Sequence, residues 1–340
     1  MSSRVIGHNE QRRRLAAAWN AGRLAHAYLF VGPPGIGKRA FARCFAQAIL
    51  CQRPNVDELE PCGECSSCKV FEGGNHPDFL EVEIEKDRHE FRIEVVRELL
   101  PKLALKPALG NERVTIFDDA DRFNDEAANA LLKTLEEPPP RSRLLLMASG
   151  VERMLPTIRS RCQTIRFAPL SAEETAEVLF QTGVVDSREN ARKLAESAGG
   201  SAAAAKELLD EEWMSLKPQV EDKLSKPTID LVYFAKTINK YCEEKAKDAA
   251  EKRRRAVLVV RTALRLFEDA LQSNAAGLPP RNGSIAAAAR LDEETLLDLI
   301  ERTLEADEQI KRYLHLPTTI DCWIDDLAQI AAGTFSPTAK

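Results

Sequence analysis

The feature that most restricts the fold of this chain is a glycine-rich loop between a short apolar run and a helical stretch. The apolar run covers residues 27–31, the helical stretch reaches residue 50, and the loop reads Gly32-Pro33-Pro34-Gly35-Ile36-Gly37-Lys38. Glycines in this setting let backbone N–H groups converge on phosphate oxygens, and the lysine neutralises the outer phosphates. The loop therefore predicts an α/β fold that handles a nucleotide such as ATP or ADP.

The residue after the lysine departs from this pattern. The position normally holds Ser or Thr, whose hydroxyl binds Mg²⁺, whereas this chain has Arg39, a permanent cation without a lone pair. A guanidinium beside the phosphates replaces part of the metal's charge but not its role as a template for in-line hydrolysis. We therefore expect no Mg²⁺ ligand here and little or no ATP hydrolysis by the chain, while nucleotide binding stays an open question.

Two more apolar runs, 114–117 and 144–148, alternate with segments of helical spacing, which is typical of a parallel sheet covered by helices. Asp118 and Asp119 follow the first of these runs. A phosphate-loop ATPase holds its magnesium carboxylate and its water-orienting acid at this place, although the second acid is usually the longer glutamate. The alternative interpretation is a pair of acids that caps a strand-end turn, because Asp is common in turns.

Four of the eight cysteines lie close together in the sequence, at Cys51, Cys62, Cys65 and Cys68. Thiolates at this spacing can surround one tetrahedral ion, and Zn²⁺ is the ion that such a set usually holds. An iron–sulfur cluster and free thiols are the alternatives, but the further cysteine and proline of the ferredoxin pattern are missing. A site closed by four thiolates leaves no open position, so we expect structural zinc.

The character of the chain changes near residue 168. Strand-like runs end there, and alanine, leucine and charged residues at helical spacing follow, with Ser171 placed as a helix cap. We therefore expect an α/β core at 1–168, a small helical lid at 169–210 and an all-helical domain at 211–340. Within the last domain the spacing predicts helices at about 228–274 and 292–314.

Charge and hydropathy limit the binding partners and the cellular location that we expect for the protein. The net charge of −5 argues against a broad basic surface for nucleic acid, so we expect any DNA contact to be shared with partner proteins. The start of the chain has no apolar stretch of a secretory signal, and no run approaches the length of a membrane span. These patterns predict a cytoplasmic location and no membrane partner.

Taken in order, these segments resemble the bacterial clamp-loader ATPases of the AAA+ class over about residues 4–210. The resemblance is carried by the phosphate loop, by the four cysteines and by the segments Val5-Ile-Gly-His8, Leu24-Ala-His-Ala-Tyr-Leu-Phe30, Phe117-Asp-Asp-Ala-Asp121, Asn129-Ala-Leu-Leu-Lys-Thr-Leu-Glu-Glu-Pro138 and Ser160-Arg-Cys162. It implies a core, a lid and a C-terminal collar that joins subunits into a ring.

Within that family the departures favour the delta-prime type over the gamma/tau motor type. Arg39 replaces the metal-binding hydroxyl, Asp119 replaces a glutamate, and Ala203 stands where the motor subunit's lid presents a sensor arginine. The resemblance implies that Arg161 acts as an arginine finger on a neighbouring subunit's nucleotide, and that Ser149 occupies the sensor-1 position. The implied partners are gamma/tau and delta subunits, the sliding clamp and primed DNA, within the DNA polymerase III holoenzyme.

Two other functions remain as alternatives. The nearest is an ATP-hydrolysing gamma/tau motor subunit, which brisk turnover by the isolated chain would reveal. From another class, the chain could be a zinc-dependent nucleic-acid-binding module, but its negative charge and its lack of interleaved aromatic and basic residues speak against this. A metabolic phosphate-loop kinase is the weakest alternative, because Arg39 and the long helical tail supply neither metal chemistry nor a substrate site.

Overall fold

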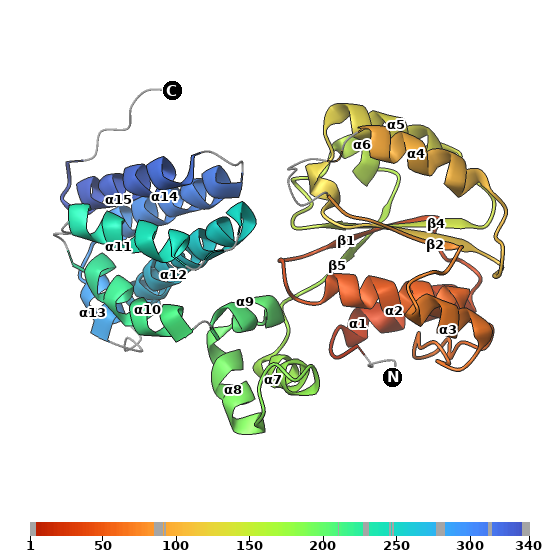
Figure 1. Ribbon diagram of the computed structural model, residues 1–340, viewed down its shortest axis with the longest axis horizontal. Coiled ribbons are helices and arrows are strands. Elements are labelled where there is room, and N and C mark those ends of the chain that lie inside the picture. The colour runs from red at the N-terminus through yellow and green to blue at the C-terminus, as the bar shows by residue number, and fades with distance from the viewer. Residues whose placement is uncertain are drawn as a thin grey trace. The chain divides into compact units, whose positions relative to one another are not determined.

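A computed structural model of the chain describes residues 5–84, 91, 93–209, 211–226, 231–244, 246, 248–276, 283–311 and 315–334. The chain divides into two compact units, Met1–Leu208 and Leu209–Lys340. Each unit has its own layers of secondary structure (Figure 1). The division of the first unit into a core and a lid at residue 168 stays a prediction.

The first unit is built round a five-stranded sheet in the order β2-β3-β4-β1-β5. Its strands are β1 (Ala27–Val31), β2 (Phe79–Val82), β3 (Arg113–Phe117), β4 (Ser142–Ala148) and β5 (Gln163–Arg166). All neighbouring strands run parallel, so their carboxyl ends meet at one edge of the sheet. This confirms the predicted α/β fold with a parallel sheet.

Alternate residues of β1 enter two separate cores, because successive side chains of a strand point to opposite faces. Tyr28 and Phe30 pack with α1 (Asn9–Asn20), α2 (Lys38–Leu50) and α3 (Ser66–Glu72). On the other face, Leu29 and its neighbours two residues away pack with α4 (Ile93–Ala104), α5 (Asp125–Glu136) and α6 (Pro156–Arg159). Figure 1 shows these two helical layers below and above the sheet. With both faces covered, β1 is buried and apolar throughout, as the sequence indicated, whereas the edge strands β2 and β5 carry polar and charged residues.

Three short helices follow the sheet within the first unit: α7 (Ala172–Gln181), α8 (Arg188–Ser197) and α9 (Ala202–Glu207). The predicted cap at Ser171 is confirmed. Its hydroxyl accepts a hydrogen bond from the Glu174 N–H at 3.1 Å, and the Glu174 carboxylate accepts one from the Ser171 N–H at 2.9 Å. Gly200, at φ +77°, leads into α9, and a Cβ there would lie 2.5 Å from the Leu170 carbonyl oxygen. Only glycine fits this crossing of the chain.

The second unit is all helical, as predicted, and its described helices are α10 (Glu211–Leu224), α11 (Leu231–Glu243), α12 (Ala249–Ala276), α13 (Gly283–Ala288), α14 (Glu293–Lys311) and α15 (Leu316–Ala331). Trp213, Phe267 and Trp323 are fully buried in it. The helix expected at about 228–274 is two helices, because Asp248 caps α12 by accepting the Glu251 N–H at 2.8 Å. Helices α10, α13 and α15 lie within the predicted all-helical domain but outside the two ranges that the spacing assigned to helices.

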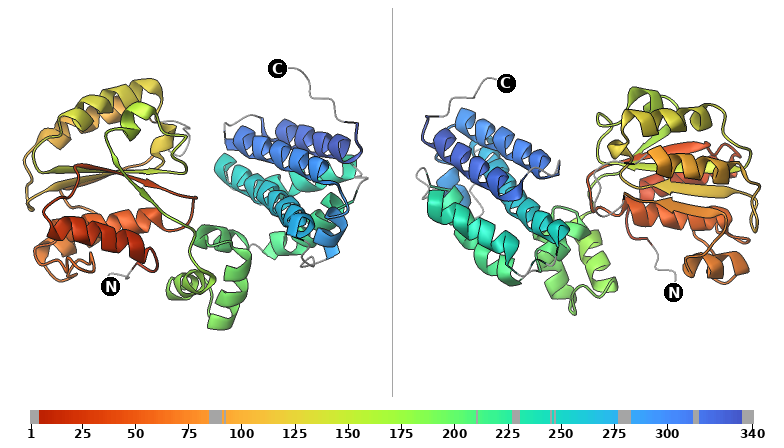
Figure 2. Two further views of the ribbon diagram at one scale, coloured as in Figure 1. Left: turned by 180° about the vertical axis from the view of Figure 1, so that it is seen from behind. Right: turned by 45° about the horizontal axis from the view of Figure 1, so that its top comes forward.

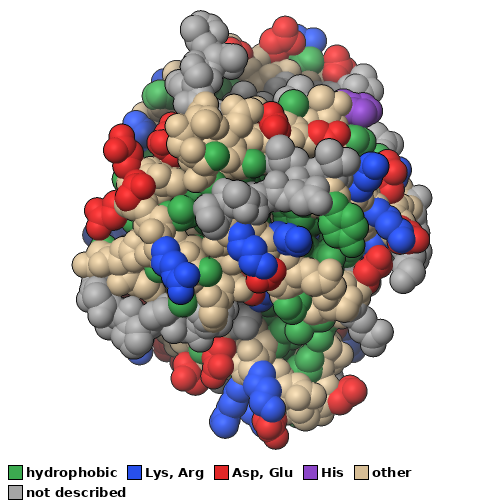
Figure 3. Space-filling view, turned by 90° about the vertical axis from the view of Figure 1, so that its left-hand side faces the viewer, with side chains coloured by type: hydrophobic (Ala, Val, Ile, Leu, Met, Phe, Trp, Pro, Cys, Tyr) green, Lys and Arg blue, Asp and Glu red, His purple; other side chains and the backbone are tan. Residues whose placement is uncertain are grey.

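The surface of the described residues carries mixed charge. On the face drawn in Figure 3, Lys and Arg side chains lie among Asp and Glu, with hydrophobic side chains between them. None of the described helices combines the length and the apolar character needed to cross a lipid bilayer.

A buried carboxylate fixes the loop between α4 and β3. The side chain of Asp78 is 0% exposed and accepts hydrogen bonds from the backbone N–H groups of Ala108, Leu109 and Gly110 at 2.7, 2.8 and 3.0 Å. Arg113 approaches the same carboxylate at 3.3 Å. Burial raises the pKa of Asp78, but the three N–H donors and Arg113 outweigh burial and hold the pKa below its usual value.

We expect Asp78→Ala to lower the free energy of unfolding of the first unit by about 3–5 kcal/mol, because it leaves a buried guanidinium without its partner. Urea unfolding followed by circular dichroism measures the loss. Because the folded pKa is lowered, the stabilisation is present above the unfolded pKa of about 3.9 and disappears as pH falls through the folded pKa. The exposed Asp186→Ala is the control, and equal unfolding midpoints for the two variants would contradict the prediction.

Candidate functional site

The predicted phosphate loop joins β1 to α2, at the carboxyl edge of the sheet. Gly35 and Gly37 take positive φ angles of +76° and +97°, which glycine adopts without steric strain. Gly32 lies against the chain after β5, and a Cβ on it would approach the Phe167 carbonyl oxygen to 2.3 Å. The strand, loop and helix context is confirmed, and these three glycines satisfy its backbone requirements.

The lysine of the loop is engaged with the loop itself. The Lys38 ammonium donates hydrogen bonds to the carbonyl oxygens of Gly32 and Pro33 at 2.6 and 2.8 Å. Burial lowers the pKa of Lys38, while Asp118 and the aspartates that follow it act in the opposite direction. A phosphate group entering the loop must therefore compete for an ammonium that already has two acceptors.

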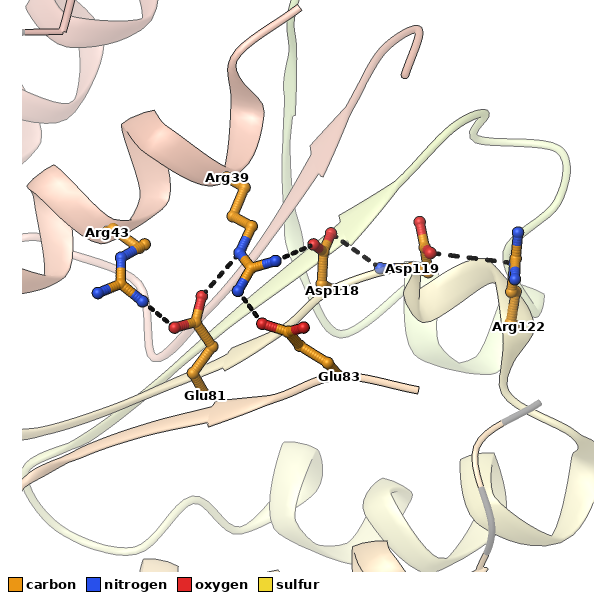
Figure 4. Close-up of polar contacts among 7 residues, drawn as sticks. All are labelled: Arg39, Arg43, Glu81, Glu83, Asp118, Asp119 and Arg122. Atoms are coloured by element: carbon orange, nitrogen blue, oxygen red, sulfur yellow. Dashed lines mark hydrogen bonds and ion pairs between the residues drawn. The ribbon is translucent and has the colours of Figure 1, made fainter. Parts of the chain in front are cut away.

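Arg39 is surrounded by carboxylates (Figure 4). Its guanidinium lies 2.9 Å from Glu81 and 3.6 Å from Asp118, and it also pairs with Glu83. Arg43, one helical turn later, pairs with Glu81 as well. A helix repeats its face at i,i+4 and a strand repeats its face at i,i+2, so two arginines of α2 meet two glutamates beside β2. The positive charge of Arg39 is thus held against the carboxylate that the sequence assigned to magnesium.

The two predicted acids do not converge on one point. Asp118 lies in the Arg39 network, where burial and Asp119 raise its pKa while Arg39 and Lys38 act to lower it. Asp119 takes the left-handed conformation, at φ 55°, as the N-cap of the short 3₁₀ helix Ala120–Arg122. Its carboxylate turns toward Arg122, with 4.0 Å between the charged atoms (Figure 4). The carboxylate of Asp119, to which the sequence assigned the orientation of water, therefore points away from Arg39.

Ser149 follows β4, directly beside the end of β1, where Val31 pairs with Ala148. Its backbone N–H donates to the Asp121 carboxylate at 3.0 Å, and its hydroxyl donates to the same oxygen. The predicted sensor-1 residue is thus tied to the turn after β3, and Asp121 is a member of the site that the sequence did not single out.

The start of α9 and the residue before it contact the phosphate loop within the first unit. The Ser201 hydroxyl donates to the Pro34 carbonyl at 3.3 Å, and the Ala203 N–H donates to the Gly35 carbonyl at 3.5 Å. A Cβ built on Gly35 would lie 2.7 Å from the Cβ of Ala203. The position that the resemblance compares with a sensor arginine therefore holds a small residue against the loop.

Arg161 lies apart from the phosphate loop, in the turn between α6 and β5. Its guanidinium donates to the Glu136 carboxylate at 2.6 Å and to the Thr157 carbonyl at 2.9 Å. About a third of its side chain, 34%, is exposed. Among the described residues, no hydrogen bond or ion pair joins Arg161 to the phosphate loop of its own chain. A side chain held by one surface carboxylate can be withdrawn from it by a stronger anion.

The four predicted metal-ligating cysteines come together between α2 and β2. Their sulfur atoms all lie within 4.8 Å of one another, in the set Cys51, Cys62, Cys65 and Cys68. The Cys51 and Cys65 sulfurs are 3.9 Å apart, and the cysteines are not joined as disulfides. Tetrahedral zinc with bonds of about 2.3 Å to sulfur places its ligands about 3.8 Å apart, so this set fits the ion.

Backbone donors surround the same sulfur atoms. The Cys62 N–H donates to the Cys51 sulfur at 3.3 Å, and the Cys68 N–H donates to the Cys65 sulfur at 3.4 Å. The N–H groups of Glu64 and Cys65 lower the pKa of Cys62 to about 6, whereas burial raises the pKa of Cys68. Helix α2 has 13 residues and spans about 20 Å, so this cluster is far from the phosphate loop at its other end. Its position suits a structural ion.

Sequence reasoning did not single out Glu81, Glu83 or Arg43 for the site. A signal was present, because acidic residues alternate along residues 80–85 at a spacing typical of a strand, and arginines repeat at i,i+4 after the phosphate loop. Helix and strand periodicity alone do not show that these two faces meet. Glu85, the last acid of that run, lies outside the described residues.

Comparison with known proteins finds similarity to subunits of DNA polymerase III. A sequence model of the family described as DNA polymerase III, delta subunit, matches residues 7–171. The delta-prime subunit of DNA polymerase III from Pseudomonas aeruginosa is 37% identical over 202 residues, which cover 59% of this chain and 61% of that protein. The chain thus matches about three fifths of the length of this relative.

The chain is also similar to tau/gamma subunits of DNA polymerase III. The tau/gamma subunit from Haemophilus influenzae is 34% identical over 211 residues, which cover 61% of this chain and 30% of that protein. Among solved structures, a DNA polymerase III gamma subunit-related protein from Thermotoga maritima covers 96% of this chain at 15% identity. Its TM-score of 0.42 is too low to support a functional comparison.

Proposed function

We propose that this chain, whose residues 7–171 belong to the DNA polymerase III delta subunit family, is a delta-prime-type subunit of a sliding-clamp loader with a silent ATP site of its own. The observation that carries the proposal is the engagement of Arg39 by Glu81, Glu83 and Asp118. Phosphoryl transfer depends on a metal between the phosphates and such a carboxylate. A guanidinium that is covalently part of the chain holds that place with a fixed charge, and although its N–H groups can donate hydrogen bonds to phosphate, it cannot coordinate water and phosphate oxygens together as a metal ion does.

Three further contacts support a silent site. The Lys38 ammonium is bonded to carbonyls of its own loop, Asp119 turns toward Arg122, and Ala203 rests on the loop where a motor subunit's lid would present a cation. None of these groups is placed to stabilise negative charge that develops during hydrolysis. ATP or ADP can still enter as a ligand of the loop, but Mg²⁺ has no hydroxyl to bind at position 39.

In this proposal the chain works through its neighbours. Gamma/tau motor subunits and a delta subunit complete the ring, and the ring loads the sliding clamp onto primed DNA in the cytoplasm. Arg161 reaches the nucleotide of an adjacent motor subunit, and Ser149 positions the turn after β3. Zn²⁺ held by the four cysteines fixes the insertion between α2 and β2 and takes no part in the chemistry.

The isolated chain is expected to hydrolyse ATP no faster than its Lys38→Ala variant, with Mg²⁺ present. The comparison is needed because Lys38→Ala removes any turnover that belongs to the phosphate loop and leaves contaminating ATPase unchanged. A coupled phosphate-release assay on both proteins measures the difference.

Reconstitution with gamma/tau and delta subunits tests the positive side of the proposal. Clamp loading onto primed circular DNA is expected to require this chain and to survive Lys38→Ala. Lys38-dependent turnover by the isolated chain at the rate of a motor subunit would instead favour the gamma/tau alternative.

A further inference from the structure

The second unit contains a groove that the loader role does not explain. Helices α11 and α15 border a cavity of about 850 Å³. Its floor includes Ala235 from α11 and Ile324 from α15, and Ile324 is 1% exposed. The groove therefore has a narrow apolar base, in which the half-buried Ala235 is the apolar side chain that a docked helix can reach.

The walls of the groove carry charge along each helix. Lys236 and Lys240 lie one turn apart on α11, and Asp321 and Asp325 lie one turn apart on α15. All four of these residues are exposed. Residues at i,i+4 share one face of a helix, so each pair forms a short charged row beside the apolar floor.

Acidic groups outnumber basic groups in this lining. Two glutamates at the end of α11, Glu243 and Glu244, bring the total to four carboxylates against two ammonium groups. Glu244 lies 3.7 Å from Lys240, and Glu243 lies 3.7 Å from Lys252 outside the groove. Among the described residues, no such cation lies beside the aspartates of the α15 wall.

Asp321 and Asp325 are bonded to neutral partners. Asp321 accepts a hydrogen bond from the Asn239 amide at 2.8 Å, and Asp325 accepts one from the Gln329 amide at 2.8 Å. Neither forms an ion pair with any residue that the structure describes. The unbalanced charge of the groove is therefore negative and lies along α15.

We propose that the groove between α11 and α15 docks an amphipathic helix of another protein, with its apolar face over Ala235 and a row of Lys or Arg along Asp321 and Asp325. Charge complementarity selects the basic edge, and the i,i+4 spacing of the two aspartates matches the spacing of cations along a helix. The binding is independent of the ATP site, so it holds whether or not the chain serves in a clamp loader.

Cys322 supplies a native reporter for the test, because it is exposed and lies beside Asp321 on α15. A thiol-reactive fluorophore on Cys322 can follow titration with a synthetic amphipathic peptide of about five helical turns, with leucines on one face and lysines flanking them. The same peptide with glutamates in place of the lysines is the charge control. We expect the lysine peptide to change the fluorescence with saturation and the glutamate peptide to leave it unchanged.

Two variants separate docking from unspecific attraction. Asp321→Asn combined with Asp325→Asn is expected to weaken the binding of the lysine peptide about tenfold, because it removes both charges of the acidic row. Ala235→Trp fills the floor and is expected to abolish saturable binding. Asp298→Asn combined with Glu301→Gln removes two exposed acids of α14 outside the groove and should leave the affinity unchanged.

Circular dichroism of each variant verifies that the helices remain folded. Equal affinity for the lysine and glutamate peptides would overturn the proposal, and so would equal weakening by the α14 control. Because the titration contains no other loader subunit, its failure is distinct from a failure of reconstituted clamp loading.

Discussion

A loader reconstituted with Arg161→Ala is expected to lose ATP turnover at the motor site that this chain completes, by about 10³-fold or more. An arginine finger supplied in trans is worth about 10³–10⁵ in rate, because it stabilises charge on the transferring phosphoryl group. Arg161 suits this role, since it stands in the turn after α6 and is held by Glu136 alone among the described carboxylates. Single-turnover ATP hydrolysis with clamp and primed DNA present measures the loss.

Two neighbouring changes test whether the loss comes from the finger or from the fold. Arg159→Ala removes an exposed arginine two residues away and should leave turnover unchanged. Glu136→Gln releases Arg161 from its ion pair without removing the guanidinium, and should preserve or raise the rate. Because Arg161 makes surface contacts only, the variant chain should unfold at the same urea concentration as the original. Unchanged turnover with Arg161→Ala would refute the finger role.

Loss of metal from the cysteine cluster is expected to have the largest effect on stability. Structural zinc sites in zinc-finger peptides bind with an apparent free energy of about 10–16 kcal/mol, which is largely folding free energy. We expect the purified chain to carry one zinc ion and Cys65→Ser to release it. Hydrogen exchange should then show loss of protection between α2 and β2, while the phosphate loop about 20 Å away keeps its protection.

The control for the metal prediction is Cys322→Ser. Cys322 is exposed and lies outside the cluster, so its replacement should leave the zinc content unchanged. Colorimetric zinc release on thiol modification measures the content of each protein. If the chain is purified without zinc, and its protection from hydrogen exchange between α2 and β2 is the same before and after a chelator is added, the four thiols pack without an ion.

Local sequence patterns were sufficient for much of the fold. The apolar run at 27–31 and the glycines after it predicted β1, the phosphate loop and the start of α2, because these features depend on backbone conformation and on neighbouring residues. The Ser171 cap was found for the same reason. The second unit was harder, since one helical period continued through two helices and only the Asp248 cap marks the break.

At the site, too, the sequence predicted the features that depend on short-range spacing and missed those that depend on tertiary contacts. Short-range spacing brought the four cysteines into one predicted cluster, and their sulfur atoms do converge. Spacing did not reveal Glu81 and Glu83 as partners of Arg39, because the residues are about 40 positions apart along the chain. It also could not indicate that Asp119 turns away toward Arg122, since that depends on one left-handed φ angle.

The sequence by itself determined which chemical groups the phosphate loop contains, and it showed that Arg39 offers no hydroxyl to a metal. Only the tertiary structure decided what that arginine does. Packing of α2 against β3, the neighbour of β2 in the sheet, sets a guanidinium among three carboxylates. The free energy of a charge depends on the groups that surround it rather than on its neighbours in the chain.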